Sequence, residues 1–216
     1  MNFKSVIISC AITAASSASL FAQSAQSPYV FPEFVKANVL QKSGGIAEAM
    51  LDYNTITEEM MFIDKDNARL VLDGDNIDTV YIANRKFIPT RKVYFEKLTE
   101  TSVPLFVQYK SKAVPTGSNK PAGESNQVMG MNGTAKKGEL QKLTSYDLKL
   151  PENYTLKTEN IYWVQKEGAF YPTSNVKKII KFFPGKEAAI DAFVKENNIS
   201  MSSQADMIKL INFCNK

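Results

Sequence analysis

The sequence predicts an α+β protein in which an antiparallel β-meander body is followed by a small C-terminal helical segment. Between residues 46 and 109, short apolar runs alternate with turn signals, which is the pattern of successive strands. After residue 173 the apolar residues recur at helical spacing. A hydrophobic content of 44% and an aromatic content of 11% are sufficient for a core and favour one rich in β-structure.

Turn signals divide the β-meander into strands at residues 46–53, 60–63, 69–72, 77–82, 87–88, 91–98 and 105–109. Asp73-Gly74 lies between two of these strands and indicates a hairpin, because Gly adopts positive φ without steric cost. Pro89 is expected to end its strand, and Pro104 indicates an edge strand or a strand start. The run 70–72 is apolar on both faces, so part of the sheet is expected to be covered on both sides.

Side-chain alternation assigns residues of the last two strands to faces. Tyr94 and Glu96 share one face of their strand, and Leu105, Val107 and Tyr109 share one face of the next.

Less regular segments flank the meander. Residues 28–32 are extended, and 33–40 are compatible with a short helix or a strand. Residues 114–146 contain five of the ten glycines and should form a long, mobile surface loop. Beyond it, 154–156 resume extended structure, and 161–171 form a hairpin that turns at Gly168.

Three short helices are predicted at the C-terminal end. Ser174 is expected to cap the first, residues 186–197 form the second, and Ser203 with Asp206 fits a capping pattern for the third. Their apolar sides are formed by Val176, Ile179, Ile180 and Phe183, by Ile190, Phe193 and Val194, and by Met207, Leu210, Ile211 and Cys214. Helices this short need tertiary packing, so they are expected to dock on the β body with Trp163 and Phe170 near the contact.

The first 22 residues are predicted to be a signal peptide. Lys4 supplies a positive n-region, residues 6–18 an apolar and small-residue h-region, and Ala22-Gln23 a cleavage point. The apolar run is too short for a membrane span, and it continues past Cys10, which argues against a lipoprotein. Cleavage would leave Cys214 without an intrachain partner. We interpret Cys214 as a packing residue of the last helix; a reactive thiol is the alternative.

Several runs resemble an uncharacterised family of exported proteins of Gram-negative bacteria. They are residues 53–60 (YNTITEEM), 80–89 (VYIANRKFIP) and 106–112 (FVQYKSK), followed by 162–164 (YWV), Phe183-Pro184, Asp206, Lys209-Leu210 and Cys214-Asn215. The resemblance covers most of the chain after the leader and implies export. It brings no catalytic or binding residue. The middle loop departs most, since similar proteins tend to be richer there in Gly, Tyr and Ser.

Composition excludes some chemistry. There is no histidine, so Ser-His and Cys-His nucleophile pairs and imidazole metal sites are excluded. The carboxylates at 58–59 and 64–66 are more typical of strand ends and turns than of an acid–base pair. In residues 133–138 the glycines have P-loop spacing, but Glu139-Leu140 replace the required Lys-Ser/Thr.

Two features of the sequence are compatible with ligand binding. Asp64, Asp66, Asp73, Asp75 and Asp78 suggest calcium, yet an EF-hand counted from Asp64 has Arg69 and Asp75 where Gly and Glu are needed. Ordinary turn chemistry is therefore favoured. Tyr162, Trp163, Phe170 and Tyr171 could form a carbohydrate-stacking platform, but core and cross-strand packing is favoured.

The sequence thus predicts a signal peptide at 1–22, a β-rich body at 23–172 with a flexible loop at 114–146, and a docked helical segment at 173–216. The expected function is that of an exported, non-enzymatic envelope protein, a binding or assembly component in the periplasm, at the outer membrane or outside the cell. Its expected partner is an envelope protein or a glycan. No cofactor, catalytic residue or metal ligand is assigned, and the ligand-binding residues are left open.

Other functions are compatible with the sequence. A carboxylate-dependent hydrolase of an envelope polymer is the alternative, and a calcium- or glycan-binding module overlaps the first reading. A formal charge of +4, lowered by one when Lys4 leaves with the leader, does not favour nucleic acid. No transmembrane segment is expected in the mature chain.

Overall fold

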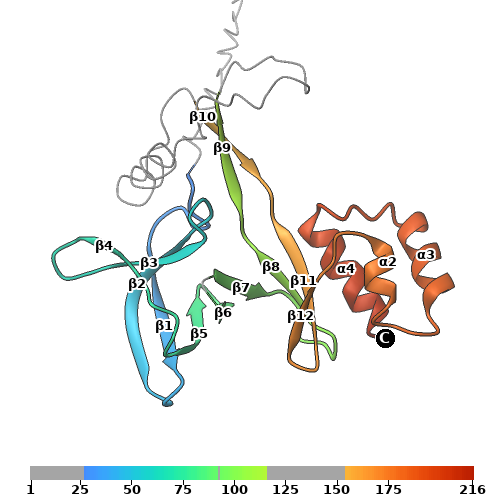
Figure 1. Ribbon diagram of the computed structural model, residues 1–216, viewed down its shortest axis with the longest axis horizontal. Coiled ribbons are helices and arrows are strands. Elements are labelled where there is room, and N and C mark those ends of the chain that lie inside the picture. Colours follow the sequence, from blue (N-terminus) through green and yellow to red (C-terminus); the bar gives the residue numbers. More distant parts are fainter. Residues whose placement is uncertain (1–26, 92, 116–153) are drawn as a thin grey trace, which may run out of the picture.

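The computed structural model describes residues 27–91, 93–115 and 154–216. They form an α+β fold, as predicted, in which one antiparallel ten-stranded sheet has the order β12-β11-β8-β7-β6-β5-β1-β2-β3-β4 (Figure 1). The first eight strands are β1 (Val35–Gln41), β2 (Ile46–Asn54), β3 (Glu59–Ile63), β4 (Arg69–Val71), β5 (Ile77–Ile82), β6 (Arg85–Thr90), β7 (Val93–Lys97) and β8 (Leu105–Gln108). The last two are β11 (Ile161–Lys166) and β12 (Ala169–Pro172).

The segment at 33–40, whose sequence is compatible with a short helix or a strand, forms all of β1 except its last residue. This strand lies centrally, because it pairs with β2 on one side and β5 on the other. The meander is therefore not sequential throughout, since β4 is an edge strand that pairs only with β3 in the described sheet.

The prediction of a hairpin at Asp73-Gly74 is wrong. β4 and β5 do not pair, and the chain between them crosses from the sheet edge back to β1. Gly74 does not have positive φ. A Cβ there would lie 3.2 Å from Pro89 Cβ and 3.2 Å from the hydroxyl of Tyr94, so close packing favours glycine at this position.

The prolines gave one correct and one incorrect boundary. β8 begins directly after Pro104, as predicted, but it is a central strand and not an edge. Pro89 does not end β6, which continues to Thr90. The pairing of β6 with β5 ends at Phe87, so the missing N–H of Pro89 faces no partner on that side.

The N-terminal part of the sheet curls, so that β3 contacts β7. The inner side is filled by buried apolar residues: Phe31, Ala37, Val39, Leu51, Tyr53, Met60, Ile77, Val80, Ile82, Phe87 and Tyr94. The segment before β1 helps to close this core, since Val30 donates its N–H to the carbonyl of Tyr53 at 3.0 Å. We call this the first core.

The C-terminal part of the sheet carries a long two-stranded arm. β9 (Ser111–Pro115) continues the direction of β8, and β10 (Tyr154–Thr158) leads into β11, so the pairs β8–β11 and β9–β10 run as one ribbon (Figure 1). The β11–β12 hairpin turns at Glu167 and Gly168 with φ of 52° and 79°, which confirms the predicted turn.

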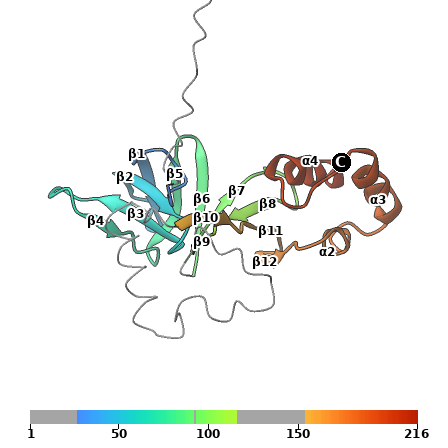
Figure 2. The same cartoon turned by 90° about the horizontal axis from the view of Figure 1, so that it is seen from above.

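Three helices lie beside this ribbon: α2 (Val176–Ile180), α3 (Glu187–Glu196) and α4 (Gln204–Cys214) (Figures 1 and 2). Ser203 caps α4 by accepting the N–H of Asp206, as predicted. Asn175 and not Ser174 caps α2, because its side chain reaches the N–H of Lys178. No described helix has the length and apolar character needed to cross a membrane.

The helices pack on the β body through a second core. Leu105 and Val107 of β8, together with Tyr162 and Val164 of β11, supply the sheet side. The buried helical side chains are Ile179, Phe183, Ile190, Met207, Leu210, Ile211 and Cys214. The prediction for the inner side of the last helix is confirmed, since its four apolar residues are all fully buried.

The expectation that Trp163 and Phe170 lie near this contact is wrong. Trp163 alternates with Tyr162 and Val164 and therefore points to the opposite face. There it stacks on Phe95 with ring centroids 5.0 Å apart, and Phe170 meets Phe95 and Phe106 edge-on. The helices therefore pack on one face of this part of the sheet, and on the other face the aromatic side chains of its own strands pack together.

Several predictions lie outside the described residues. They concern the leader at 1–22 with Cys10, and the glycine motif at 133–138. The loop predicted at 114–146 lies outside them apart from its first two residues, which end β9.

Candidate functional site

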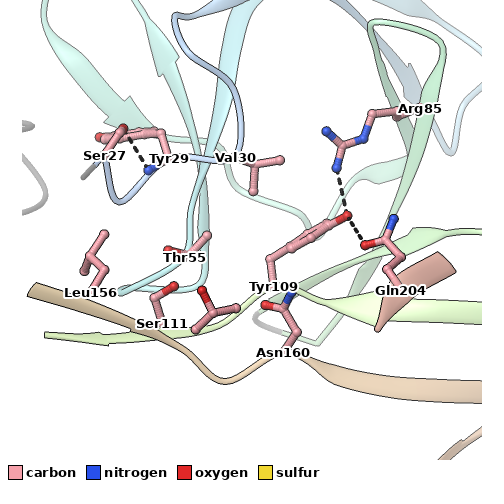
Figure 3. Close-up of a pocket in the computed structure, with 11 residues that line it drawn as sticks. Ser27, Tyr29, Val30, Thr55, Arg85, Tyr109, Ser111, Leu156, Asn160 and Gln204 are labelled. Atoms are coloured by element: carbon pink, nitrogen blue, oxygen red, sulfur yellow. Dashed lines mark hydrogen bonds between the residues drawn. The ribbon is translucent and has the colours of Figure 1, made fainter. Parts of the chain in front are cut away.

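A cleft of about 560 Å³ lies where the curled part of the sheet, the two-stranded arm and α4 meet (Figure 3). Its lining residues are Ser27, Tyr29, Val30, Thr55, Arg85, Tyr109, Ser111, Leu156, Thr158, Asn160 and Gln204. We call it the junction cleft. Its volume is in the range typical of small-molecule sites, and its polar groups come from segments far apart in the sequence.

Arg85, which lines the junction cleft, forms an ion pair with Glu96. Arg85 donates from Nε to Oε1 of Glu96 at 2.8 Å and from Nη2 to Oε2 at 2.7 Å. The two residues lie on the neighbouring strands β6 and β7, and the Glu96 side chain is only 7% exposed. A two-point guanidinium–carboxylate contact fixes both groups in one plane.

Tyr109 extends this pair toward the helices. Its hydroxyl accepts from Nη2 of Arg85 at 2.9 Å and donates to Oε2 of Glu96. Oε1 of Gln204, the first residue of α4, lies 3.1 Å from the same hydroxyl. The aromatic ring of Tyr109 contacts both the first and the second core, so this polar group marks the boundary between them.

Aromatic rings shield the guanidinium of Arg85. Its Cζ atom lies 4.6 Å from the ring centre of Phe31, 5.3 Å from that of Phe87 and 5.4 Å from that of Tyr109. Burial lowers the pKa of Arg85, but the hydrogen bonds and charge of Glu96 outweigh this and raise it. Burial and the negative charge of Glu96 also raise the pKa of Tyr109, so its phenol keeps its proton.

Three side chains of the cleft keep unused N–H donors. Among the described residues, Nη1 of Arg85, Nδ2 of Asn160 and Nε2 of Gln204 donate no hydrogen bond. Figure 3 shows that a terminal nitrogen of Arg85 points toward Val30 across the cleft. Asn160 is held in place through its oxygen, which accepts the N–H of Lys110 at 3.1 Å.

A buried carboxylate lies behind the Val30 wall. Asp52, which is 1% exposed, accepts the N–H of Phe31 at 3.1 Å and that of Tyr53 at 2.7 Å. Burial raises the pKa of Asp52 to about 7, although these backbone hydrogen bonds oppose the shift. Asp52 therefore fastens the N-terminal segment to β2 and is not open to a ligand.

A second polar network lies on the other face of β8. Glu58 accepts from Nζ of Lys110 and from Nε2 of Gln108, and Oε1 of Gln108 accepts from Nε1 of Trp163 at 3.2 Å. Glu58 has a φ of 62°, the left-handed conformation, and it is the last residue of the turn between β2 and β3. This network ties the turn before β3 to the ribbon.

The acidic residues considered for catalysis or calcium are not brought together. Glu58 is used as described above. Asp64 accepts the N–H groups of Asp66 and Ala68, and Asp73 accepts that of Asp75, which is ordinary turn chemistry. In residues 27–91, 93–115 and 154–216, no group of three or more Cys, Asp or Glu side chains is placed to hold a metal ion.

The four aromatic residues proposed as a stacking platform do not share a surface. Tyr162 faces the second core, whereas Trp163 and Phe170 pack with Phe95 and Phe106 on the opposite face. The ring of Tyr171 lies against that of Phe182, with the ring centroids 5.2 Å apart. Core and cross-strand packing is therefore confirmed for this hairpin.

Cys214 is a packing residue, as interpreted from the sequence. It is fully buried in the second core, and burial raises the pKa of its thiol to about 11. A thiol with this pKa carries almost no thiolate near neutral pH.

Comparison of the chain with protein families, with curated proteins and with solved structures gave no match.

The residues that form the junction cleft were not singled out from the sequence. Alternation placed Tyr109 on the face of Leu105 and Val107, which is correct, and grouped Glu96 with Tyr94. Glu96, a charged residue on the same strand face as the aromatic Tyr94, was the signal in the sequence that could have indicated a buried polar group. Its partner Arg85 follows a turn, and Asn160 and Gln204 reach the site only through tertiary structure.

Proposed function

We propose that the protein is an exported, non-enzymatic binding or assembly component of a Gram-negative envelope, and that it holds its ligand in the junction cleft. Lys4 and the apolar run at 6–18 support export, as does the resemblance of 53–60, 80–89 and 106–112 to exported proteins. The observation that carries the binding role is the convergence of donors from Arg85, Asn160 and Gln204 on one cleft.

The state of the nearby carboxylates favours binding over catalysis. Glu96 is occupied by two hydrogen bonds from Arg85 and one from Tyr109. A general acid or base must reach the proton that it transfers, and Glu96 has its oxygens turned to these partners. Side chains that already hold each other in fixed positions instead suit a preformed binding surface.

A carboxylate-dependent hydrolase of an envelope polymer is the second candidate. One observation favours it, because the pKa of Asp52 is raised to about 7, a value suited to acid–base catalysis. Burial of Asp52 and its backbone hydrogen bonds argue against it, since substrate would have to displace the segment of Tyr29 to Phe31.

The two functions are separated by one experiment on the 23–216 protein. The protein is incubated with envelope fragments, which are then sedimented, and both the bound protein and the soluble products are measured. Retention of the protein without release of products is expected. Release of soluble fragments that is lost in Asp52→Asn would show that the hydrolase is correct, and absence of both retention and release would contradict the binding role.

A further inference from the structure

The junction cleft offers mainly hydrogen-bond donors. Nη1 of Arg85, Nδ2 of Asn160 and Nε2 of Gln204 together carry six N–H bonds, because each is an NH₂ group. The hydroxyls of Ser111 and Thr158 also line the cleft, and no hydrogen bond from either to another described residue is present. A matching ligand must accept several hydrogen bonds and donate a few.

The charge at the site is already balanced. The positive charge of Arg85 is met by Glu96 at 2.7 Å in a contact that is largely buried. An anion bound at Nη1 would add a second negative charge beside Glu96, where low exposure makes like charges costly. A cation would be repelled by the guanidinium of Arg85 and would meet the N–H donors of Asn160 and Gln204. The side-chain oxygen of Asn160 already accepts from Lys110, and that of Gln204 lies beside the hydroxyl of Tyr109. The chemistry therefore favours an uncharged ligand.

Hydroxyl-rich ligands fit this pattern better than peptides. Each hydroxyl can accept two hydrogen bonds and donate one, so a ring with neighbouring hydroxyls can accept from planar NH₂ groups and donate to Ser111 or Thr158. A peptide backbone brings one N–H for every carbonyl, and the cleft offers few acceptors for those N–H groups. Val30 and Leu156 provide apolar contacts for the carbon faces of a sugar ring.

We propose that the ligand of the junction cleft is an uncharged saccharide, whose hydroxyls accept hydrogen bonds from Arg85, Asn160 and Gln204 while the Arg85–Glu96 pair stays intact. The proposal rests on the binding function given above and names its ligand class. The saccharide contacts β6, the two-stranded arm and the first residue of α4 together.

The test uses calorimetric titration of the 23–216 protein with soluble probes. The uncharged probes are tetrasaccharides of glucose, galactose, mannose and N-acetylglucosamine. A uronic-acid tetrasaccharide is the anionic probe, and an uncharged Gly-Ser-Asn decapeptide is the peptide probe. Binding of at least one uncharged tetrasaccharide, and weaker binding of the other two probes, is the expected result.

Variants locate the binding. Asn160→Asp keeps the oxygen that accepts the N–H of Lys110 and removes the two donors. Gln204→Met and Thr158→Val keep the side-chain size and remove polar atoms. Each is expected to weaken saccharide binding about three- to tenfold, the effect of one lost hydrogen bond. Asn38→Asp on the exposed side of β1 is the matched control and should not change it.

Three outcomes overturn the proposal: no binding of any uncharged tetrasaccharide, stronger binding of the uronic-acid or peptide probe, or saccharide binding that Asn160→Asp leaves unchanged. The sedimentation experiment distinguishes this failure from failure of the function. If the protein is retained on envelope fragments but binds no saccharide in the titration, the saccharide proposal is wrong and the envelope-binding role stands. If it is not retained, the function itself is wrong.

Discussion

Arg85 and Glu96 face each other through two hydrogen bonds of 2.8 and 2.7 Å at the boundary between the two apolar cores of one sheet. Arg85 and Glu96 lie on neighbouring strands of the sheet. The hydroxyl of Tyr109 connects the pair to α4, because it accepts a hydrogen bond from Arg85 and lies 3.1 Å from Oε1 of Gln204. Arg85 of this pair also lines the junction cleft. One polar group therefore connects the two cores and also contributes Arg85 and Tyr109 to the proposed binding site.

Arg85→Met should destabilise the protein, because it leaves Glu96 buried without its cation. We expect the free energy of unfolding to fall by about 3 kcal/mol, the size of effect seen when one member of a buried pair is removed. Urea unfolding followed by circular dichroism measures it. The double variant Arg85→Met with Glu96→Leu should recover part of the loss, since neither charge remains.

Lys36→Met is the matched control for this prediction. Lys36 pairs with Glu48 at 2.8 Å, but both side chains are more than half exposed, so the change should cost less than about 1 kcal/mol. Equal losses in Arg85→Met and Lys36→Met would contradict a special role for the buried pair.

Asp52 should make stability depend on pH. The pKa of Asp52 is about 7 in the folded protein and about 3.9 when unfolded. The folded state therefore holds the proton more tightly, so the contribution of this group to stability is fully present below about pH 4 and is lost as the pH rises through 7. Urea unfolding at about pH 5 and about pH 8 tests this.

Asn in place of Asp52 keeps an acceptor for the backbone N–H groups and cannot titrate in this range. In Asp52→Asn the difference in stability between the two pH values should therefore be smaller than in the natural protein. An unchanged difference would show that Asp52 is ionised in the folded state, held by the N–H groups of Phe31 and Tyr53.

The thiol of Cys214 should be protected. It is fully buried and its pKa is raised to about 11, so Ellman's reagent should label the folded 23–216 protein far more slowly than the same protein in concentrated urea. Rapid labelling without urea would mean that α4 leaves the sheet readily, or that the thiol is reactive.

The helical segment should not fold alone. Its buried residues pack against Leu105, Val107, Tyr162 and Val164, which a 172–216 peptide lacks. Circular dichroism of that peptide should show partial helix and no cooperative melting, because short helices depend on tertiary packing. A sharp thermal transition of a monomeric, fully helical peptide would refute this.

Local signals in the sequence were sufficient for most elements and not for their order in the sheet. The cap at Ser203 and the turn at Gly168 depend on a few neighbouring residues, and both were correctly predicted. The return of β5 to β1 depends on pairing between distant strands, so Asp73-Gly74 was wrongly assigned to a hairpin. The predicted end of a strand at Pro89 was wrong for the same reason. Whether a proline ends a strand depends on which side of that strand is paired, and this is set by distant strands.

The candidate site could not be predicted from the sequence for a related reason. Asn160 follows an ordinary strand, Gln204 is the first residue of a helix, and Arg85 follows a turn, so each has a common local context. Only the tertiary structure brings their N–H groups to one cleft. Helical spacing correctly assigned the four buried residues of α4, and strand alternation correctly assigned the face of Tyr109, because burial repeats with the period of each element.

Hydrogen–deuterium exchange of the 23–216 protein, with and without envelope extract, tests the binding site most directly because it requires no knowledge of the ligand. With extract, exchange is expected to slow in residues 27–30, 109–113 and 156–160 and to stay unchanged in β4 and α3. Asn160→Asp should reduce this protection. Protection confined to β4, α3 or the outer aromatic face of β11 and β12 would contradict the assignment of the junction cleft as the binding site.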